Sequence, residues 1–253
     1  MRTLWLVVVA AAASLLGGPS VAAQVAAPKA DAQPKSVIEL YTSQGCSSCP
    51  TADALLKTLA QRPDVIALSL PVDYWDYLGW KDTLAKPKFT ARQRAYAKMR
   101  GDGKIYTPQM VINGLMHVNG AHAGEIEEAI LKTSGKLAGE RIPVRISASG
   151  GKLLIETGAV AEGDKPKDGT IWLAVIQKEA QVPVRAGENR GRTLTYYNVV
   201  RELTAVGTWS GKPVTIGLNQ AAVMKPEADG CAVLLQNGAT GPIVGAALLA
   251  NAQ

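Results

Sequence analysis

The chain has 253 residues, of which 47% are hydrophobic, and a formal net charge of +6 at pH 7. This length suits one large domain or two small ones, and either can bury a hydrophobic core. The lysines and arginines are scattered, with no long basic run and no nucleic-acid-binding motif, which argues against a nucleic-acid partner.

The N-terminus has the pattern of a secretory signal peptide. Arg2 precedes a predominantly apolar stretch over residues 4–16, and the small residues 21–23 suit a cleavage site. We therefore expect a signal peptide over 1–23, a linker over 24–35, and a periplasmic or secreted protein. An uncleaved membrane anchor is the alternative, although the apolar stretch is short for a bilayer span. No later segment is apolar enough to span, so no stable membrane span is expected after cleavage.

The first part of the body alternates strand-like and helix-like patterns, which predicts an α/β sheet. Strands are expected up to Tyr41, over 65–72 and on both sides of a hairpin after Pro108, and helices over 49–60, 90–99 and 124–133. From Ile142 onward, short alternating strands are separated by Gly, Pro, Asp and Asn, which is typical of a β-sandwich. The sequence thus predicts an α/β domain over residues 36–138 and an all-β sandwich-like domain over 139–253.

Two cysteines, Cys46 and Cys49, stand where the first strand gives way to the first helix. Thiols at this spacing can close a disulfide, and the N–H groups and dipole of the helix favour the thiolate of the first cysteine. Cys46 is therefore the candidate nucleophile, and Cys49 the thiol that resolves a mixed disulfide. A structural disulfide and a metal clip are the alternatives. Two thiols make half of a tetrahedral zinc site, and the sequence has no second cysteine pair to complete it.

Thr107 and Pro108 lead into two short apolar runs joined by Asn113-Gly114, a pattern that predicts a hairpin. We expect the Thr107–Pro108 bond to be cis. A cis-proline would place no backbone donor beside the dithiol and would present the main chain of Thr107 to an extended substrate peptide. An ordinary edge-strand proline is the alternative.

Three further residues are candidates for the site. Glu39 lies inside the first apolar strand, where burial raises the pKa of a carboxyl, so it is either a proton acceptor for Cys49 or a paired structural carboxylate. Tyr74 and Trp75 belong to an aromatic segment, residues 73–82, that directly follows a strand, at the sheet edge where α/β proteins form their sites. They either line a substrate cleft or cover the sheet edge.

Several segments together resemble the secreted thioredoxin-like proteins of domain-of-unknown-function family 1223 (DUF1223). They are residues 42–50 around the cysteines, residues 72–76 and the Thr107–Pro108 segment, and residues 187–201 also look like that family's C-terminal half. The resemblance implies a thioredoxin-like α/β domain followed by a β domain, in exported bacterial proteins. From thioredoxins it implies that the proline lies against the dithiol and that a buried carboxylate near the position of Glu39 moves protons. It implies no particular substrate.

Three classes of function remain open. The leading hypothesis is an exported thiol–disulfide oxidoreductase without a cofactor, acting on protein or small-molecule thiols and disulfides and reset by an unidentified redox partner. The second is a periplasmic copper or other metal carrier, in which His117 and His122 would join the two thiols. The third is a non-enzymatic interaction protein with a structural disulfide. The third cysteine, Cys231, is expected to be a small buried hydrophobe, and a resolving thiol is the alternative.

Overall fold

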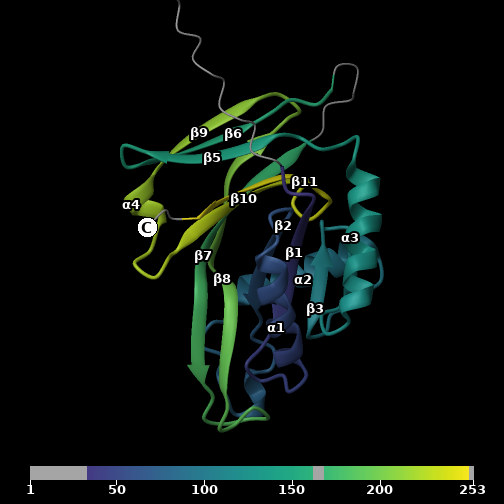
Figure 1. Cartoon of the computed structure of the whole chain (residues 1–253), viewed down its shortest axis with the longest axis vertical. Coiled ribbons are helices and arrows are strands. Elements are labelled where there is room, and N and C mark those ends of the chain that lie inside the picture. The colour runs from purple at the N-terminus through teal and green to yellow at the C-terminus, as the bar shows by residue number, and fades with distance from the viewer. Residues whose placement is uncertain (1–32, 162–167, 251–253) are drawn as a thin grey trace, which may run out of the picture. The chain divides into compact units, whose positions relative to one another are not determined.

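The structure, a computed structural model, describes residues 33–161 and 168–250 (Figure 1). The expected signal peptide and nearly all of the expected linker lie outside these residues. The helices are α1 (Cys49–Ala60), α2 (Pro87–Arg100), α3 (Ala123–Leu137), α4 (Gln220–Val223) and a short 3-10 helix, η1 (Asp76–Leu78). The first strands are β1 (Ser36–Thr42), β2 (Val65–Pro71), β3 (Gln109–Ile112) and β4 (Met116–Asn119). The later strands are β5 (Val144–Ser149), β6 (Lys152–Thr157), β7 (Gly169–Pro183), β8 (Thr193–Trp209), β9 (Val214–Asn219), β10 (Gly230–Asn237) and β11 (Ile243–Ala250).

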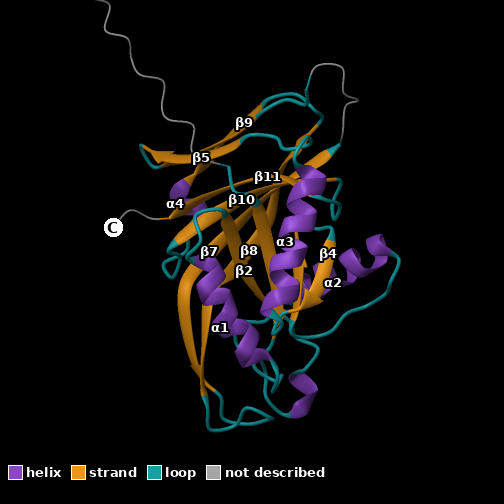
Figure 2. Cartoon of the chain, turned by 45° about the vertical axis from the view of Figure 1, so that its right-hand side comes forward, coloured by secondary structure: helices purple, strands orange, loops and turns teal. Residues whose placement is uncertain are grey.

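Eight of these strands form one mixed sheet in the order β11-β10-β7-β8-β2-β1-β3-β4, and β5, β6 and β9 form a separate three-stranded sheet (Figure 2). Strand β1 runs parallel to β2 and antiparallel to β3. The early and late strands join where β2 pairs in parallel with β8, at Ser69 and Val199. Nδ2 of Asn198 strengthens this junction by donating to the main-chain oxygen of Ala67 (3.0 Å).

The predicted fold class, a thioredoxin-like α/β domain followed by an all-β sandwich-like domain, is wrong. The described residues are mostly β, with a large mixed sheet, a three-stranded sheet and only four short α-helices. The physical reason is that β7, β8, β10 and β11 bury their apolar side chains by extending the sheet of β1 and β2, with which they share a core. The expected boundary at residue 139 stays a prediction, and the large sheet draws strands from both sides of it.

Apolar side chains on both faces of β1 hold the helices in place. Ile38 and Leu40 pack with the inner faces of α1 and α3, whereas Val37 and Tyr41 pack on the opposite face with Phe89 of α2. Because successive side chains of a strand point to opposite faces, α1 and α2 lie on opposite sides of the sheet. No helix among the described residues is long and apolar enough to cross a membrane.

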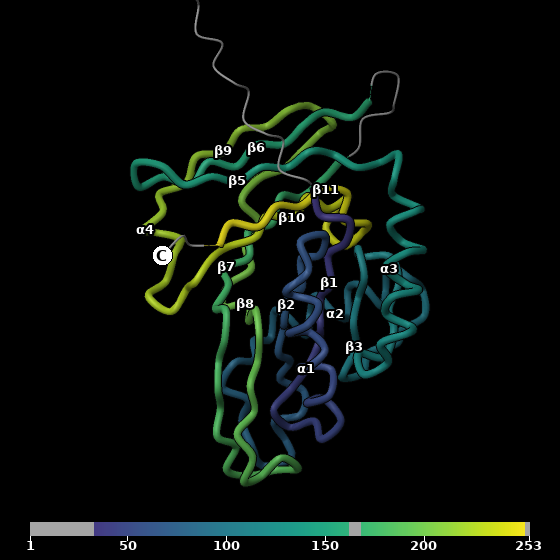
Figure 3. Tube along the Cα trace, viewed as in Figure 1, coloured from purple at the N-terminus to yellow at the C-terminus, as the bar shows by residue number. Residues whose placement is uncertain are grey.

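Strands β7 and β8 form a long antiparallel ribbon of 15 and 17 residues. They pair from Gly169 with Trp209 to Pro183 with Thr193. One end of the ribbon lies in the sheet between β10 and β2, and the other continues alongside α1 to the connecting loop, residues 184–192 (Figure 3). That loop reaches the segment between β1 and α1, which carries the two cysteines.

Candidate functional site

Cys46 and Cys49 form a disulfide between the end of β1 and the first turn of α1, with their Cα atoms 5.4 Å apart. Pro50 occupies the first turn of the helix, where its missing N–H has no intrahelical partner to lose. Both cysteines are buried: Cys46 is 3% exposed and Cys49 is 0% exposed. Ser47 and Ser48 between them are exposed. Of the two cysteines, only Cys46 keeps any solvent exposure.

The 184–192 loop covers the cysteine segment. Asn189 is fully buried at the centre of this contact. The hydrogen bonds run from Nδ2 of Asn189 to the main-chain oxygens of Gln44 (3.0 Å) and Cys46 (2.9 Å), and from the N–H of Ser47 to Oε2 of Glu188 (3.2 Å). Residues far apart in the sequence thus fix the backbone around Cys46. Nothing local in the sequence indicates which distant backbone oxygens Asn189 will bind.

The Thr107–Pro108 peptide bond is cis, which confirms that prediction. Trp75 links this segment to the cysteines. Its Nε1 donates to Oγ1 of Thr107 (2.8 Å). Trp75 also packs against Gly45, directly before Cys46. A Cβ at position 45 would lie only 2.9 Å from the Cβ of Trp75, so this position needs a glycine. Trp75, Thr107 and the cysteine segment are therefore brought together.

Pro108 lies beside the first turns of α1. Both Pro108 and Ala52 of α1 pack against Gly120. A Cβ placed on this glycine would lie 3.0 Å from the Cβ of Ala52 and 3.3 Å from the Cβ of Pro108. The N–H of Gly120 also donates to the main-chain oxygen of Pro108 (3.0 Å). Ala52 stands three residues after Cys49 on the buried face of α1, so it is a direct neighbour of Cys49 on the helix surface. The cis-proline and the disulfide thus lie at the same end of α1.

The aromatic segment divides between the site and the core. The rings of Tyr74 and Trp75 have centroids 5.9 Å apart, and both side chains pack, partly buried, against the core on the α2 side of the sheet. Burial raises the pKa of the Tyr74 hydroxyl. Tyr77 is 76% exposed and stacks on Trp75 with a centroid distance of 6.3 Å. Trp75 contacts the site directly, whereas Tyr74 supports it from the core.

Glu39 lies away from the cysteines, because its side chain points to the α2 face of the sheet. The carboxylate is 1% exposed and pairs with Arg92, with Nε and Oε1 2.6 Å apart. The hydroxyl of Tyr96 donates to Oε2 (2.5 Å), and Oε1 of Gln236 accepts from Nη2 of Arg92 (3.0 Å). Of the two alternatives for Glu39, the geometry favours the paired structural carboxylate. Its assignment as the proton acceptor of Cys49 has no contact to support it.

A different carboxyl, Asp53, shares a helix face with the disulfide. It stands four residues after Cys49 on the buried face of α1 and is 3% exposed. Neither carboxyl oxygen has a hydrogen-bond partner among the described residues. Burial raises the pKa of Asp53 well above its ordinary value; the nearby Thr42 hydroxyl opposes this rise, and Asp82 adds to it. The sequence patterns did not single out Asp53, although the four-residue spacing from Cys49 was visible.

We expect Asp53→Asn to stabilise the protein at neutral pH. The folded-state pKa of Asp53 is raised above the unfolded value of about 3.9, so the folded state holds this proton longer. The stability that Asp53 contributes through this proton is therefore present below about pH 4 and is lost as the pH rises through its folded-state pKa. Asparagine does not titrate and has no such loss. Urea unfolding of both proteins at several pH values checks the prediction, and a difference in stability between them that is the same at pH 3 and pH 8 would contradict it.

Each histidine has a carboxylate partner of its own, away from the cysteines. Nε2 of His117 lies 3.1 Å from Asp102, and its Nδ1 lies 2.8 Å from the hydroxyl of Tyr106. Nδ1 of His122 lies 2.9 Å from Glu125. Across residues 33–161 and 168–250, no group of three or more His, Cys, Asp or Glu side chains could hold a metal ion. The copper-carrier hypothesis therefore gains no support from this arrangement.

Cys231 is a free, fully buried cysteine on β10. It packs in the apolar cluster between the large and the small sheet, and burial raises its pKa to about 11. The prediction of a small buried hydrophobe is confirmed. A thiol in this position is protonated at neutral pH and shielded from disulfide exchange.

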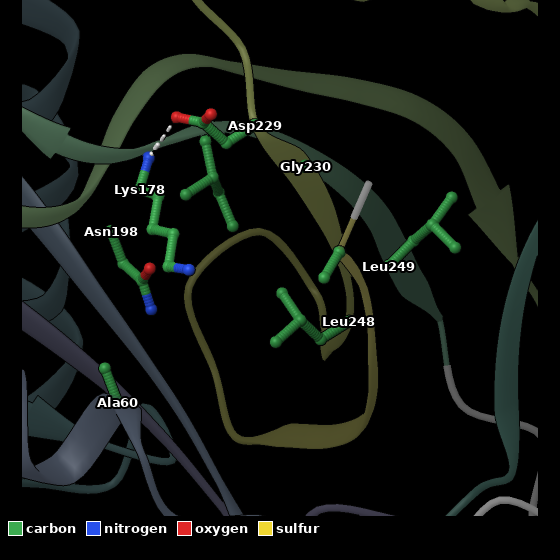
Figure 4. A pocket seen from close by; sticks show the side chains of 9 residues that line it. Ala60, Lys178, Asn198, Asp229, Gly230, Leu248 and Leu249 are labelled. Carbon is green, nitrogen blue, oxygen red and sulfur yellow. Dashed lines mark hydrogen bonds between the residues drawn. The ribbon is translucent and has the colours of Figure 1, made fainter. Parts of the chain in front are cut away.

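Two cavities lie along α1. The first, of about 370 Å³, extends from the first turn of the helix to Lys57 in its last turn and is lined by Pro50, Asp53, Ala54, Lys57, Arg192, Thr193, Leu194, Thr195 and Tyr197. The second, of about 420 Å³, lies at the C-terminal end of the helix (Figure 4). Its lining includes Ala60, Asn198, Leu248 and Asp229, which accepts from the N–H of Lys178 (2.7 Å). Of these two cavities, only the first reaches the turn of the helix that carries Cys49 and Pro50.

The fold and the site define a mixed β-sheet protein with a buried Cys-x-x-Cys disulfide beside a cis-proline. The chain belongs to the family described as "Protein of unknown function (DUF1223)", whose model matches residues 37–236. The family named in the sequence analysis is thereby confirmed. The chain is similar to the crystal structure of protein AGR_C_4864 from Agrobacterium tumefaciens, with 36% identity and a TM-score of 0.76, covering 87% of this chain and 96% of that chain. A comparison with curated proteins gives no significant match.

Proposed function

We propose that the protein is an exported thiol–disulfide oxidoreductase that exchanges electrons through Cys46 and Cys49. The observation that carries the proposal is the placement of this disulfide beside the cis-proline, next to Thr107 and Trp75. A purely structural disulfide does not need a substrate-binding segment at its side. The signal-peptide pattern over residues 1–23 supports export to a compartment in which disulfides persist.

In the oxidising direction, a substrate thiolate attacks the Cys46 sulfur, a new sulfur–sulfur bond forms, and the Cys46–Cys49 bond breaks. Cys49 leaves with the electron pair as a thiolate and takes up a proton. A second substrate thiolate then attacks the substrate sulfur of the mixed disulfide. This step releases the substrate disulfide and the Cys46 thiolate. Two electrons have passed to the cysteine pair, and a redox partner removes them to restore the disulfide.

The surroundings of Cys46 determine which molecules can reach it. The 184–192 loop holds the backbone of the cysteine segment through Asn189 and Glu188. On another side, Trp75 positions Thr107, whose main chain can receive an extended peptide as a short added strand. Substrates that fit this arrangement are small thiols and unfolded or flexible protein segments. A folded surface would have to displace the loop first.

A Cys49→Ser variant tests the proposal. Its free Cys46 thiolate should attack a peptide disulfide and keep the peptide as a mixed disulfide, because no resolving thiol remains. The reduced wild type should attack the same peptide and then release it when Cys49 closes the internal disulfide. Intact-mass measurement under non-reducing conditions distinguishes the two outcomes.

The matched control is the Cys46→Ser/Cys49→Ser double variant, which keeps only the buried Cys231 and should form no adduct. Absence of an adduct from the Cys49→Ser protein would contradict the proposal. A reduction potential of the wild-type disulfide below about −300 mV would also contradict it, because such values are typical of structural disulfides. Stoichiometric Cu(I) binding that depends on His117 and His122 would favour the metal-carrier hypothesis instead.

A further inference from the structure

We propose that Asp53 is the proton donor for Cys49 when the disulfide opens. This inference rests on the proposed function, because it assigns a residue to the step in which Cys49 leaves as a thiolate. Neither the sequence patterns nor the family description assigns any role to Asp53.

The helix geometry places the two groups together. Residues four apart on an α-helix have Cβ atoms about 5–6 Å apart on the same face. Cys49 and Asp53 both lie on the buried face of α1, which packs against β8, β2 and β1. The carboxyl is unpartnered in the described part of the chain, although an ion pair or a backbone donor is the usual arrangement for a buried acid. A proton-transfer group is a physical reason to keep such a residue in the core.

The groups that face Asp53 favour its neutral form in the disulfide state. Those on elements packed around it are Thr42 at the end of β1, Asp82 in the loop before α2, Tyr196 and Tyr197 on β8, Arg192 in the 184–192 loop, and Lys57 on α1 itself. Asp82 is held by the main-chain N–H groups of Gln44 (2.7 Å) and Leu84 (2.8 Å). The ammonium of Lys57 lies over the ring of Tyr197, 4.9 Å from its centroid, and Nη1 of Arg192 donates to Oδ1 of Asn189 (2.8 Å). Both cations are thus engaged elsewhere, and neither forms a salt bridge with Asp53 among the described residues.

The cavity beside the disulfide gives the proton a route to solvent. It is about 370 Å³ in volume, and Pro50, Asp53 and Lys57 line it on the α1 side. A cavity of this size with polar walls can hold several water molecules. Because both carboxyl oxygens of Asp53 are buried, its side chain must turn toward the cavity before water there can return the proton.

The proposed step balances as follows. The attacking thiolate bonds to the Cys46 sulfur, and the electron pair of the Cys46–Cys49 bond passes to the Cys49 sulfur. The Asp53 carboxylic acid transfers its proton to that sulfur and becomes a carboxylate. Water then reprotonates Asp53, and in the reverse direction the carboxylate accepts the proton of the Cys49 thiol. No oxidant beyond the disulfide itself is needed.

The test is the rate at which dithiothreitol reduces the disulfide, measured from pH 5 to pH 9. Each rate is divided by the concentration of dithiothreitol thiolate at that pH, because the thiolate is the attacking species. We expect Asp53→Asn to slow this step by about 10² near neutral pH, the lower end of the range for a positioned proton donor. The wild-type rate should fall as the pH rises and Asp53 loses its proton, whereas the variant rate should be flat. The wild type should also show a solvent deuterium isotope effect that the variant lacks.

The matched control is Asp64→Asn, which makes the same chemical change at a partly exposed carboxylate paired with Arg62 and should leave the rate unchanged. Equal rates for folded wild type and Asp53→Asn across the pH range would overturn the proposal. If Asp53→Asn does not fold, absence of the isotope effect in the wild type would overturn it. Because dithiothreitol is an artificial reductant, these results stand apart from the Cys49→Ser trapping experiment, whose failure would overturn the proposed function alone.

Discussion

An Arg92→Ala variant is expected to lose about 3–5 kcal/mol of unfolding free energy, the usual cost of removing one partner of a buried ion pair. The side chains of Arg92 and Glu39 are 5% and 1% exposed, so water cannot replace the lost guanidinium. Tyr96 and Gln236 would keep their contacts with each other but lose those with Arg92. Urea unfolding followed by tryptophan fluorescence measures the loss.

Two further variants show whether this loss comes from the unpaired charge. Arg62→Ala removes an exposed guanidinium that pairs with Asp64 and Glu127, and should cost only about 0–1 kcal/mol. A Glu39→Gln/Arg92→Met double variant should recover much of the stability of the single variant, because it leaves no unpaired charge in the core. If Arg92→Ala lowers the free energy of unfolding as little as Arg62→Ala does, the buried charge of Glu39 does not need Arg92 to stabilise it.

A Cys46→Ser variant is expected to lose all catalysis of thiol–disulfide exchange and to fall to the uncatalysed rate. Cys46 is the sulfur that an incoming thiol meets, whereas Cys49 is 0% exposed and cannot take its place. The measurement is the oxidation of a reduced peptide dithiol by a small disulfide, followed with and without the protein. Cys231→Ser is the matched control and should keep full activity, because Cys231 lies buried on β10. Activity that survives in Cys46→Ser, or that disappears in Cys231→Ser, would contradict the assignment.

The local elements of the site could be predicted from the sequence. The helix expected over residues 49–60 is present with those bounds. The hairpin after Pro108 turns at Asn113 and Gly114, which both have positive φ, as a tight two-residue turn requires. These features depend on neighbouring residues alone, so patterns of a few positions were enough to find them.

The sheet could not be predicted, because its membership depends on pairing between distant strands. The change of composition near residue 139 correctly indicated a run of β-strands, but nothing local indicates that β8 pairs with β2 at Ser69 and Val199. The same limit applies to Asn189, whose partners in the cysteine segment are more than 140 positions away.

The two carboxyls show where local reasoning fails and where it could have succeeded. Glu39 is on a strand buried on both faces, so alternation alone cannot say which face α1 covers. Its partner Arg92 is on α2, a helix with several arginines and lysines, and nothing local indicates which of them is buried. Asp53, by contrast, follows Cys49 by one helical turn on the apolar face, and a search for acids on that face would have found it.

The ribbon that covers the disulfide has a consequence for the order of folding. The contacts that seat it join residues 131 positions apart at Asn198 and Ala67, and 143 positions apart at Asn189 and Cys46. Contacts between such distant positions form slowly compared with helices and hairpins, because a long loop of chain must be closed first. During synthesis, the cysteine pair therefore spends time without its cover, when an external oxidant can reach both sulfurs. The first oxidation of the nascent chain and any later reaction of the native disulfide thus take place in different surroundings.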